Sequence, residues 1–519
     1  MILSVRRAAK KIQNGFFVFY MVLMLLTLYF AVNAQNLSLR SDAGDLLIGT
    51  GTTWVSVVFL GGMVVLGLYY LVNTRFQSWI DRIFVQHGVI TGSVFLAMAV
   101  AWQIILILNT HPAIGFDPGA IHEALLRPKN NPNLQSYYSY NTNNLPLALI
   151  QHQIAVMIKS TSWLTFDLLN FCLVLFTVAI DLIIIRLIAK DRIAIALYTH
   201  AIWLFIFPMT LVPYSDVAVL PFVALLLLCY VIVFQQSKVN ICSISASVVG
   251  GFVVCGIYLL KPSAIVPIVA IGIIELLNLF LHASQRLKTA LGMLALVSTF
   301  AVSAAWGYNM ASHKIAKQTY MIIQPHRTLP PIHFISMGVS GDGGYNPDDA
   351  LAMVKQPSQQ AMAKYSEDKL VERLRQKGFF GYLAFLLHKQ DKNTSDGTFT
   401  WLKEGHFMTA TPVKTGGIKG FMQNIFYPGG HYLSDFHFIA QIFWVLCLSI
   451  ITLGWRVRDR MTDVLRLGIV GGFCYLLIFE GGRSRYIIQF LPLFILLTII
   501  VFPSVVSMLK EKLSWLKSD

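Results

Sequence analysis

Long apolar segments alternate with short polar ones along most of the 519-residue chain. A helix needs about 20 apolar residues to cross the hydrocarbon core of a bilayer. Twelve segments have roughly this length and lie at residues 15–34, 53–73, 88–108, 162–186, 192–213, 217–235, 241–260, 263–282, 289–310, 436–455, 463–479 and 486–507. The pattern therefore predicts an all-α polytopic membrane protein with about twelve transmembrane helices.

Lysine and arginine gather in every second short connection between these segments. Arg6 and Arg7 precede the first segment, Arg456 and Arg458 lie between the tenth and the eleventh, and Lys510 follows the last. Cytoplasmic loops of membrane proteins carry an excess of basic residues. This distribution predicts that both ends of the chain are cytoplasmic and that the connections poor in basic residues face the outside.

Two of the outward connections are long. Residues 1–310 are predicted to hold the first nine helices, with an outer loop at residues 109–161 between the third and the fourth. Residues 311–433 are long enough for a small extracytoplasmic domain, and residues 434–519 hold the last three helices and a cytoplasmic tail. Within the domain, the apolar and aromatic stretch Gly378–Leu387 suits the surface of the bilayer.

The composition excludes an ordinary soluble protein. Hydrophobic residues make up 56% of the chain, and the mean hydropathy is +0.63, whereas a soluble fold could not cover so much apolar surface. The net charge of +15 does not indicate a nucleic-acid partner, because most of it lies in the short loops that set the topology. The lipid bilayer is the predicted partner. All six cysteines lie in apolar segments, so the sequence predicts neither a disulfide framework nor a cysteine metal site.

The segment Glu480–Tyr486 places three charged side chains between the last two apolar segments. Arg483 and Arg485 are two positions apart, close to a glutamate, two glycines and a tyrosine. Guanidinium groups bind phosphate oxygens through paired hydrogen bonds, and glycine lets the backbone approach a ligand closely. The combination favours a phosphate-binding site on the outer face. The structural alternative is that each arginine only anchors a helix end among the lipid headgroups.

Two aspartates and a lysine on the same predicted face complete a candidate site. Asp117 follows the third helix and precedes Pro118, so it is either a general base at the membrane surface or part of a helix N-cap. Asp216 lies in a short outer turn and has the same two interpretations. Lys261 lies in another such turn, either as a second cation for a phosphate or as an interfacial side chain that reaches the headgroups.

Four ionisable residues fall within the predicted helices, where a charge is costly and often functional. They are Asp167, Asp181, His200 and Glu275. A proton relay is one interpretation. The other is that these residues lie near the helix ends and pair locally, as Asp181 can with Arg186 about one turn away.

His333 lies in the long outer segment and is either a substrate ligand or a structural histidine. Together with Asp342 and Asp348 it could bind a metal ion, but the spacing matches no defined metal motif. Gly341 and Gly343 do not have the spacing of a nucleotide-binding loop either. No defined metal or nucleotide motif can therefore be assigned to this segment.

Short motifs in a fixed order along the chain resemble a known family. They are Phe116-Asp117-Pro118-Gly119, Tyr140 with Asn143-Asn144, Pro213-Tyr214-Ser215-Asp216, His333 to Gly338 with Gly341 to Tyr345, Asp396-Gly397-Thr398-Phe399, and Gly482 to Tyr486. With an acidic residue in the first large outer loop and a late outer Arg-x-Arg-Tyr, the chain resembles the GT-C fold glycosyltransferases. More narrowly, it resembles a group of integral membrane glycosyltransferases from Gram-positive bacteria.

The resemblance implies a GT-C-like fold and an enzyme of the cell membrane whose active site faces the extracytoplasmic side. Such enzymes take a sugar from a polyprenyl-phosphate carrier, here by inverting transfer to a cell-wall glycan, a teichoic acid or a protein. Asp117 matches the catalytic base of that family. Asp216 stays the other candidate, because the acidic loop follows the third span here rather than the first. Arg483 and Arg485 match the contacts to the carrier phosphate, with Lys261 as a further cation.

Further contacts to the sugar or its carrier are expected from Tyr140, Asn143, Asn144, His333 and Tyr486. No cofactor is required when the leaving group is a monophosphate, and a divalent metal stays open. Two other functions would use the same outer arginines: a transporter or flippase for a lipid-linked glycan, and a ligase that joins preformed glycans. The sequence shows no paired short or broken spans of the kind expected in inverted-repeat transporters.

Overall fold

The computed structural model describes residues 2–39, 51–126, 131–235, 239–281, 287–402, 407, 413–414 and 416–512. Within these residues the chain is all-α and has no β-strand; one isolated bridge joins Ile114 and Phe407. The predicted class, an all-α polytopic membrane protein, is confirmed.

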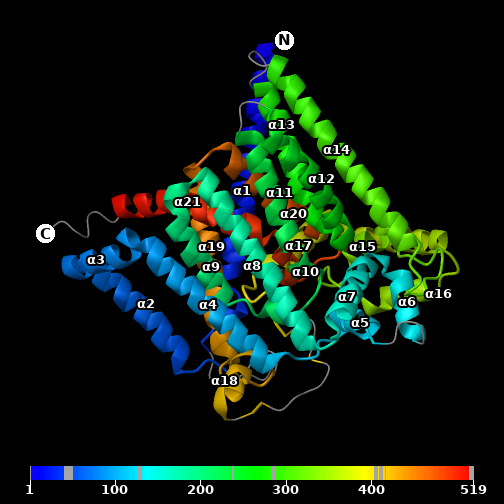
Figure 1. Ribbon diagram of the computed structural model, residues 1–519, viewed down its shortest axis with the longest axis horizontal. Helices are drawn as coiled ribbons and strands as arrows, with labels where there is room; N and C mark the ends of the chain where they lie inside the picture. The colour runs from blue at the N-terminus through cyan, green and yellow to red at the C-terminus, as the bar shows by residue number, and fades with distance from the viewer. Residues whose placement is uncertain are drawn as a thin grey trace.

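Eleven helices in the described part of the chain are long and apolar enough to cross a membrane. They form the bundle in Figure 1. These helices are α1 (Ile2–Val32), α2 (Trp54–Val72), α4 (Gly88–Thr110), α8 (Trp163–Ile188), α10 with α11 (Ser215–Ala218 and Leu220–Gln235), α12 (Ile241–Leu260), η6 with α13 (Pro262–Ile265 and Val266–Leu281), α14 (Leu287–Ala316), α19 with η7 (Leu433–Leu453 and Gly454–Arg456), α20 (Arg460–Ile478), and η8 with α21 (Ser484–Phe490 and Leu491–Lys512).

The predicted span at residues 192–213 is not one continuous helix. Its α-helix, α9 (Ile193–Phe205), has 13 residues, and the short 3-10 helix η5 (Pro208–Leu211) follows after two residues. Pro208 has no N–H to donate and disfavours helical geometry in the residue before it, so the helix ends there. The expectation of twelve continuous helices is therefore wrong at this segment.

Two amide side chains bond the backbone that this break exposes. Gln103 on α4 donates to the carbonyls of Leu204 and Phe207. Asn170 on α8 lies within hydrogen-bond distance of three more carbonyls, those of Met209, Thr210 and Val212. A bilayer core offers no water, so carbonyls freed by a helix break need partners within the protein.

Between α8 and α11 the chain nevertheless passes from one end of the bundle to the other. Arg192, after α8, donates to the carbonyl of Ile500 within α21. Tyr214, just before α10, reaches Asp117 in the first long loop. The short helix and the irregular stretch after it therefore act together as one passage through the bundle.

Short helices from the two long loops cover one end of the bundle, which we call the loop end (Figure 1). The two loops contact each other there: the backbone of Gln324 donates to Ser139 at 2.9 Å, and the rings of His152 and Tyr320 stack. The first loop forms α5 (Phe116–Ala124), α6 (Pro132–Tyr140), η3 (Thr142–Asn144) and α7 (Leu145–Ile158), and the second forms α15 (Pro331–Met337), α16 (Pro347–Lys355), α17 (Gln359–Thr394) and α18 (Gly417–Phe426). The remaining short helices are η1 (Gln35–Leu37), α3 (Thr74–Asp81), η2 (Arg82–Gln86) and η4 (Lys190–Arg192).

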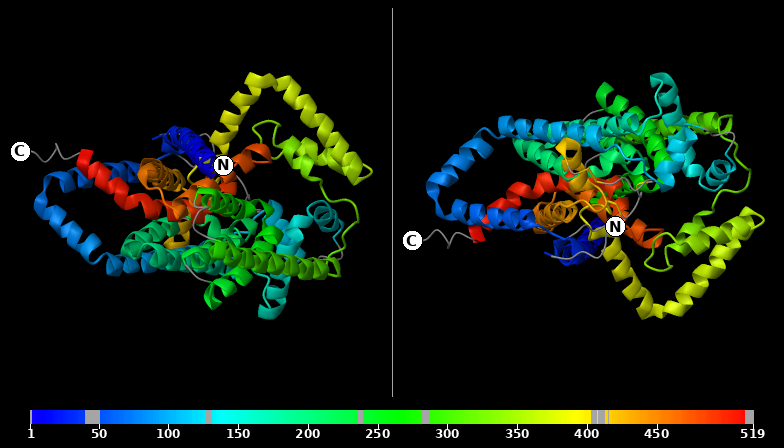
Figure 2. Two further views of the ribbon diagram at one scale, coloured as in Figure 1. Left: turned by 90° about the horizontal axis from the view of Figure 1, so that it is seen from above. Right: turned by 90° about the horizontal axis from the view of Figure 1, so that it is seen from below.

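The longest helix of the second loop, α17, is sharply bent. Gly378 has φ +59° and ψ −176°, which interrupts the helix and which a residue with a side chain rarely adopts. Figure 2 shows the resulting V, whose apex projects away from the bundle. Phe379 and Phe380 at the apex are 73% and 82% exposed. The second limb returns to the bundle and ends among the residues described below.

The most enclosed helices start at the loop end. In the most apolar window of α11 and of α21, 72% of the residues are buried, against 6% in α2. Asp216 lies in the turn that leads into α11, and Arg485 lies in η8, which leads into α21. Two of the predicted site residues therefore lie at the loop end, where the two most enclosed helices begin.

Candidate functional site

Asp117 lies in the first turn of α5, and two tyrosine hydroxyls hold its carboxylate. Tyr137 donates to Oδ1 at 2.6 Å, and Tyr214 donates to Oδ2 at 2.9 Å. The residue at the N-cap position of α5 is Gly115. The interpretation of Asp117 as a helix cap is therefore wrong, and its oxygens are bonded to the tyrosines instead.

The residues on either side of Asp117 fix its direction. Phe116 has φ +55°, in the left-handed region that few residues other than glycine adopt. Its ring is 66% exposed, so burial of the ring does not explain this conformation. Pro118 follows with a restricted φ and is itself buried. Together they turn the chain so that the Asp117 carboxylate faces inward while the Phe116 ring faces outward.

Asn144 connects the two tyrosines. Its Nδ2 donates to the Tyr137 hydroxyl at 2.6 Å, and the Tyr214 hydroxyl lies 3.2 Å from its Oδ1. Burial, followed by the charge of Asp117, raises the pKa of Tyr137 well above its usual value, so this phenol stays protonated and remains a donor. Among the described residues, no lysine, arginine or histidine forms an ion pair with Asp117. Neutral donors alone therefore orient this carboxylate.

Asp216 lies in a different environment, because two cations flank it. Lys261 Nζ lies 2.5 Å from Oδ1 and Arg485 Nε lies 3.3 Å from Oδ2. All three side chains are buried, with exposures of 3%, 9% and 6% for Asp216, Lys261 and Arg485. The N-cap position of α10 is Tyr214, so the cap interpretation of Asp216 is also wrong. Lys261 does not extend to the headgroups either, since it is buried against a carboxylate.

Two tyrosine rings enclose the cations. Lys261 Nζ lies 5.5 Å from the centre of the Tyr214 ring and 5.1 Å from that of Tyr486. The Arg485 guanidinium lies 5.5 Å and 5.4 Å from the same two rings. Such distances allow attraction between a cation and the π-face of the ring. Because the Tyr214 hydroxyl also bonds Asp117, the base candidate and the cation pair form one continuous cluster.

Glu480 and Arg483 border this cluster. The Tyr486 hydroxyl donates to Glu480 at 3.1 Å, and the Arg483 guanidinium lies 5.9 Å from the centre of the Tyr345 ring. Burial raises the pKa of Glu480, and the charge of Arg483 opposes that shift. Asp117 also acts on the pKa of Glu480, which places both carboxyl groups in one electrostatic environment.

Two glycine-rich motifs meet beside the arginines. The N–H of Gly481 donates to the carbonyl of Gly343 at 2.9 Å. Gly482 has φ +72°, and a Cβ on it would lie 2.7 Å from the backbone nitrogen of Gly344. A residue other than glycine would therefore be strained at position 482 and would push the two backbone segments apart. This contact gives the glycines of both motifs a structural role. Neither motif has the spacing of a nucleotide-binding loop.

Two predicted substrate contacts have other partners in the structure. The Tyr140 hydroxyl accepts a hydrogen bond from Arg327, whose guanidinium lies 4.9 Å from the centre of the Tyr140 ring. His333 is buried in α15, and burial lowers its pKa while Asp349 and Arg373 act on it with opposite signs. Both residues join parts of the loop end to each other, and their contact with a substrate stays a prediction.

Asn143 lies at the edge of the cluster, with Nδ2 3.4 Å from Asn144 Oδ1. Of the predicted site residues, the structure therefore brings together in one connected set Asp117, Asn143, Asn144, Asp216, Lys261, Arg485 and Tyr486, with Arg483 beside it.

Two of the four ionisable residues expected within the helices, Asp181 and His200, pair with each other. Asp181 lies 3.6 Å from His200 Nε2, both fully buried, rather than with Arg186 as expected. Glu275 pairs with Arg460 and accepts a hydrogen bond from a tyrosine. Asp167 is buried and has no hydrogen-bond partner among the described residues. These contacts are made away from the Asp117 cluster.

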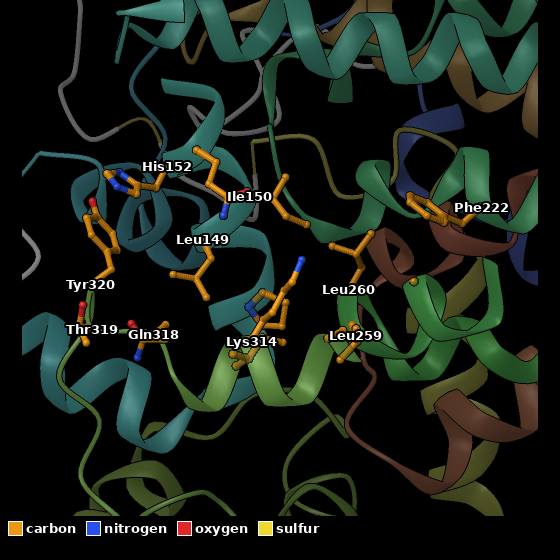
Figure 3. A pocket seen from close by; sticks show the side chains of 15 residues that line it. Leu149, Ile150, His152, Phe222, Leu259, Leu260, Lys314, Gln318, Thr319 and Tyr320 are labelled. Carbon is orange, nitrogen blue, oxygen red and sulfur yellow. The ribbon is translucent and has the colours of Figure 1, made fainter. Parts of the chain in front are cut away.

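An apolar cavity lies between α7 and α12 (Figure 3). Its volume is about 580 Å³, and α7, α11, α12 and the end of α14 form its walls. Leu260, which precedes Lys261 in the chain, lines it, and so does Pro146, two residues after Asn144. The polar side chains in its lining are His152, Gln153, Lys314, Gln318, Thr319 and Tyr320. Apolar residues make up the rest of the lining.

The described residues contain no group of three or more histidine, cysteine, aspartate or glutamate side chains placed to hold a metal ion. All six cysteines are free thiols. The carboxylates of the cluster are bonded to phenols or paired with cations, as described above.

Two tyrosines carry contacts that sequence reasoning did not assign. Tyr137 is 20 positions from Asp117 and Tyr214 is 97 positions away, so no local pattern links them. For Tyr214 there was one signal: it belongs to the same short motif as Asp216. Tyr137 is one of three tyrosines in α6, and only the fold distinguishes it from Tyr140.

Comparison with the curated proteins finds no match, and comparison with the solved structures finds none either. A comparison with known families does find a match, which extends from residue 8 to residue 506. The chain therefore belongs to the family described as "conserved hypothetical integral membrane protein", in agreement with the multi-pass helical bundle of the structure.

Proposed function

We propose that this protein is a GT-C-type membrane glycosyltransferase that transfers a sugar from a polyprenyl-phosphate carrier to an extracytoplasmic acceptor of the cell envelope. The observation that carries the proposal is the position of Asp117: two phenols orient it, beside the Lys261–Arg485 pair and an apolar cavity. A proton acceptor, cations for a phosphate and room for a lipid chain are the three elements that this reaction needs.

The cations suit the leaving group. In sugar transfer from a lipid phosphate, the bond between the anomeric carbon and the phosphate oxygen breaks, and the phosphate leaves with the electron pair. Its negative charge grows in the transition state, so nearby cations stabilise the transition state more than the ground state. Lys261 and Arg485 both lie against Asp216, and Arg483 lies beside them. Three cations gathered in this way suit a phosphate group.

Asp117 suits the role of base better than Asp216. An acceptor hydroxyl that attacks the anomeric carbon must lose its proton, and a carboxylate within about 3 Å can take it. Tyr137 and Tyr214 bond Asp117 without neutralising it. Two cations bind Asp216 directly, and protonation would remove the charge that holds them. We therefore propose that Asp117 is the base of an inverting sugar transfer and that Asp216 has a structural role in the cation site.

The cavity supports a lipid-linked donor. A prenyl chain is apolar, and the walls of the cavity are mostly apolar side chains from α7, α11, α12 and α14. Leu260 and Lys261 are neighbours in the chain, so a phosphate at Lys261 would place the first isoprene units at the cavity mouth. A soluble nucleotide sugar has no long apolar chain that such a cavity could bind.

The charge distribution supports an extracytoplasmic site. Arg456, Arg458 and Arg460 lie in the connection between α19 and α20, at the opposite end from the loop end. Basic connections are typical of the cytoplasmic side. The loop end would then face the outside, where wall glycan, teichoic acid and protein acceptors are found.

One observation favours a second function, a flippase or transporter for the same lipid-linked substrate. α9 is short and interrupted, and discontinuous helices form the substrate sites of many transporters. However, Gln103 and Asn170 already bond the carbonyls freed by this break. A glycan ligase would share the arginines and differ only in its donor.

The test is sugar transfer by the purified protein in lipid nanodiscs, with a panel of polyprenyl-phosphate sugars and isolated envelope fractions as acceptors. We expect wild type to release polyprenyl phosphate and label an acceptor, Asp117→Asn to do neither, and Asp348→Asn, at an exposed acid of the same loop end, to match wild type. Movement of donor across vesicles without sugar release would contradict glycosyltransfer and support the flippase. Release only with a preformed oligosaccharide on the carrier would support the ligase.

A further inference from the structure

The side chain of Lys389, in the second limb of α17, is fully buried and ends among backbone carbonyls. Its ammonium donates to the carbonyl of Gly338 at 2.6 Å, to that of Phe479 at 2.6 Å and to that of Leu477 at 3.1 Å. The three N–H bonds of an ammonium match these three acceptors. Burial lowers the pKa of Lys389 to about 8, and nearby acidic groups oppose that shift, so the ammonium form prevails at neutral pH.

Two of these carbonyls, those of Leu477 and Phe479, belong to the end of α20, and the third, that of Gly338, follows α15. The last carbonyls of a helix have no partner within the helix, and they form the negative end of its dipole. A lysine is therefore well suited to this position, although it usually comes from the same helix. Here the cation comes from α17, in a separate part of the chain.

Asn393 stands one turn after Lys389 on the same face of α17. Its Nδ2 lies 3.3 Å from the carbonyl of Leu476, in the last turn of α20, and its Oδ1 accepts from the N–H of Gly482 at 2.6 Å. Lys389 therefore fixes the end of α20, and Asn393 fixes both that end and the loop that follows it.

Further hydrogen bonds connect the end of α17 to the segment that carries the arginines. Ser484 donates to the carbonyl of Lys392 at 3.2 Å and accepts from the N–H of Asp396 at 3.3 Å. The N–H of Arg485 donates to Thr400 at 3.2 Å. The backbone that carries the arginines is thus bonded along its length to the end of α17 and the turn after it.

We propose that Lys389 is a positioning residue that, with Asn393, holds the loop after α20 so that Arg483 and Arg485 reach the cation cluster around Asp216. The assignment of a substrate phosphate to that cluster rests on the proposed function; the positioning of the loop does not. The extracytoplasmic helix α17, and not only the membrane helices, would then set the geometry of the phosphate site.

The path of the Lys389 stem supports this assignment. A Cβ on Gly343 would lie 2.5 Å from Lys389 Cδ and 2.6 Å from Cε, so Gly343 leaves only the space that the stem needs. The carbonyl of Gly343 also accepts from Gly481 in the same loop. A single packing arrangement therefore fixes the lysine and the loop together.

The experiment compares Lys389→Met with Lys392→Met, at an exposed lysine one turn along α17 whose backbone carbonyl, not its side chain, contacts Ser484. Hydrogen exchange of the loop amides, in particular those of Gly481 and Gly482, is measured in nanodiscs. Loss of charge-assisted bonds should raise their exchange at least about tenfold in Lys389→Met and leave it unchanged in Lys392→Met. In the transfer assay, the same variant should show a raised KM for the polyprenyl-phosphate donor and a smaller change in KM for the acceptor.

Unchanged exchange at Gly481 and Gly482 in a folded Lys389→Met protein would overturn the proposal. Uniformly faster exchange throughout the bundle would also overturn it, because it would show general destabilisation. Should Lys389→Met fail to fold, Gly343→Ala tests the same contact from the opposite side and must loosen the same amides. If the loop loosens as expected but wild type transfers no sugar from any donor, the proposed function fails while the positioning role stands.

Discussion

Tyr214 donates a hydrogen bond of 2.9 Å to Asp117, although 97 positions separate the two residues in the chain. The ring of the same tyrosine lies 5.5 Å from both Lys261 Nζ and the Arg485 guanidinium. One side chain therefore joins the candidate base to the candidate phosphate site.

Asp117→Asn keeps the shape of the side chain and removes the proton acceptor. We expect normal expression and thermal stability, with turnover lowered about 10²–10⁴-fold, the usual contribution of a general base. The measurement is sugar transfer at matched protein level, with Asp348→Asn as the control. Full activity of Asp117→Asn would leave Asp117 without a catalytic role.

Asp216→Asn should act on stability first. It removes the counter-charge of two buried cations, Lys261 and Arg485, and breaking a buried ion pair costs about 3–5 kcal/mol. We expect a clearly lower melting temperature in detergent and poor expression. A variant as stable as wild type would contradict this structural role. If it also transferred no sugar while Asp117→Asn stayed active, Asp216 would be the base.

Tyr214→Phe separates the two roles of this residue. The ring that contacts Lys261 and Arg485 stays, and the hydroxyl that bonds Asp117 is lost. A hydrogen bond to a charged group contributes about 1.5–3 kcal/mol, so turnover should fall roughly 10- to 150-fold while donor KM changes little. A raised donor KM with unchanged turnover would show that the hydroxyl serves the phosphate site instead.

Arg485→Lys and Arg483→Lys test the phosphate contact. Lysine keeps the charge and loses the planar fork that binds two phosphate oxygens. Each replacement should raise donor KM about as much as the alanine variant, by roughly 1.5–3 kcal/mol of binding. Arg375→Lys, at an exposed position of α17, is the control. If both lysine variants transfer sugar as wild type does, the guanidinium forks do not bind the donor phosphate, and the two cations serve only the structure of the cluster.

Glu480 makes stability depend on pH. Burial raises its pKa above the usual 4.5, so between these two values the folded protein binds more protons than the unfolded chain. Stability from this group is therefore present at low pH and is lost as pH rises from about 4.5 through the raised pKa. Glu480→Gln removes this loss, so its melting temperature relative to wild type should increase with pH. A difference that stays constant between pH 4 and pH 8 would contradict the assignment.

The class of the protein and most of its helices could be predicted from the amino-acid sequence alone. Length and hydropathy decide whether a segment can cross a bilayer, and both are local properties. This reasoning located eleven helices close to their final bounds. It failed at residues 192–213, where Pro208 ends α9 and where Gln103 and Asn170, on other helices, bond the exposed carbonyls. The stability of that break depends on residues far away in the sequence, so local hydropathy could not predict it.

Residue chemistry also pointed to most residues of the cluster, because a carboxylate, lysine or arginine in an apolar chain is costly and stands out. The tertiary structure alone decided how these residues pair. Asp117 and Asp216 had the same two interpretations in the sequence, and only the fold places phenols at Asp117 and cations at Asp216. Lys389 gave no signal at all in the sequence. Its importance depends on carbonyls that come from two other segments, and such contacts form only when the chain folds.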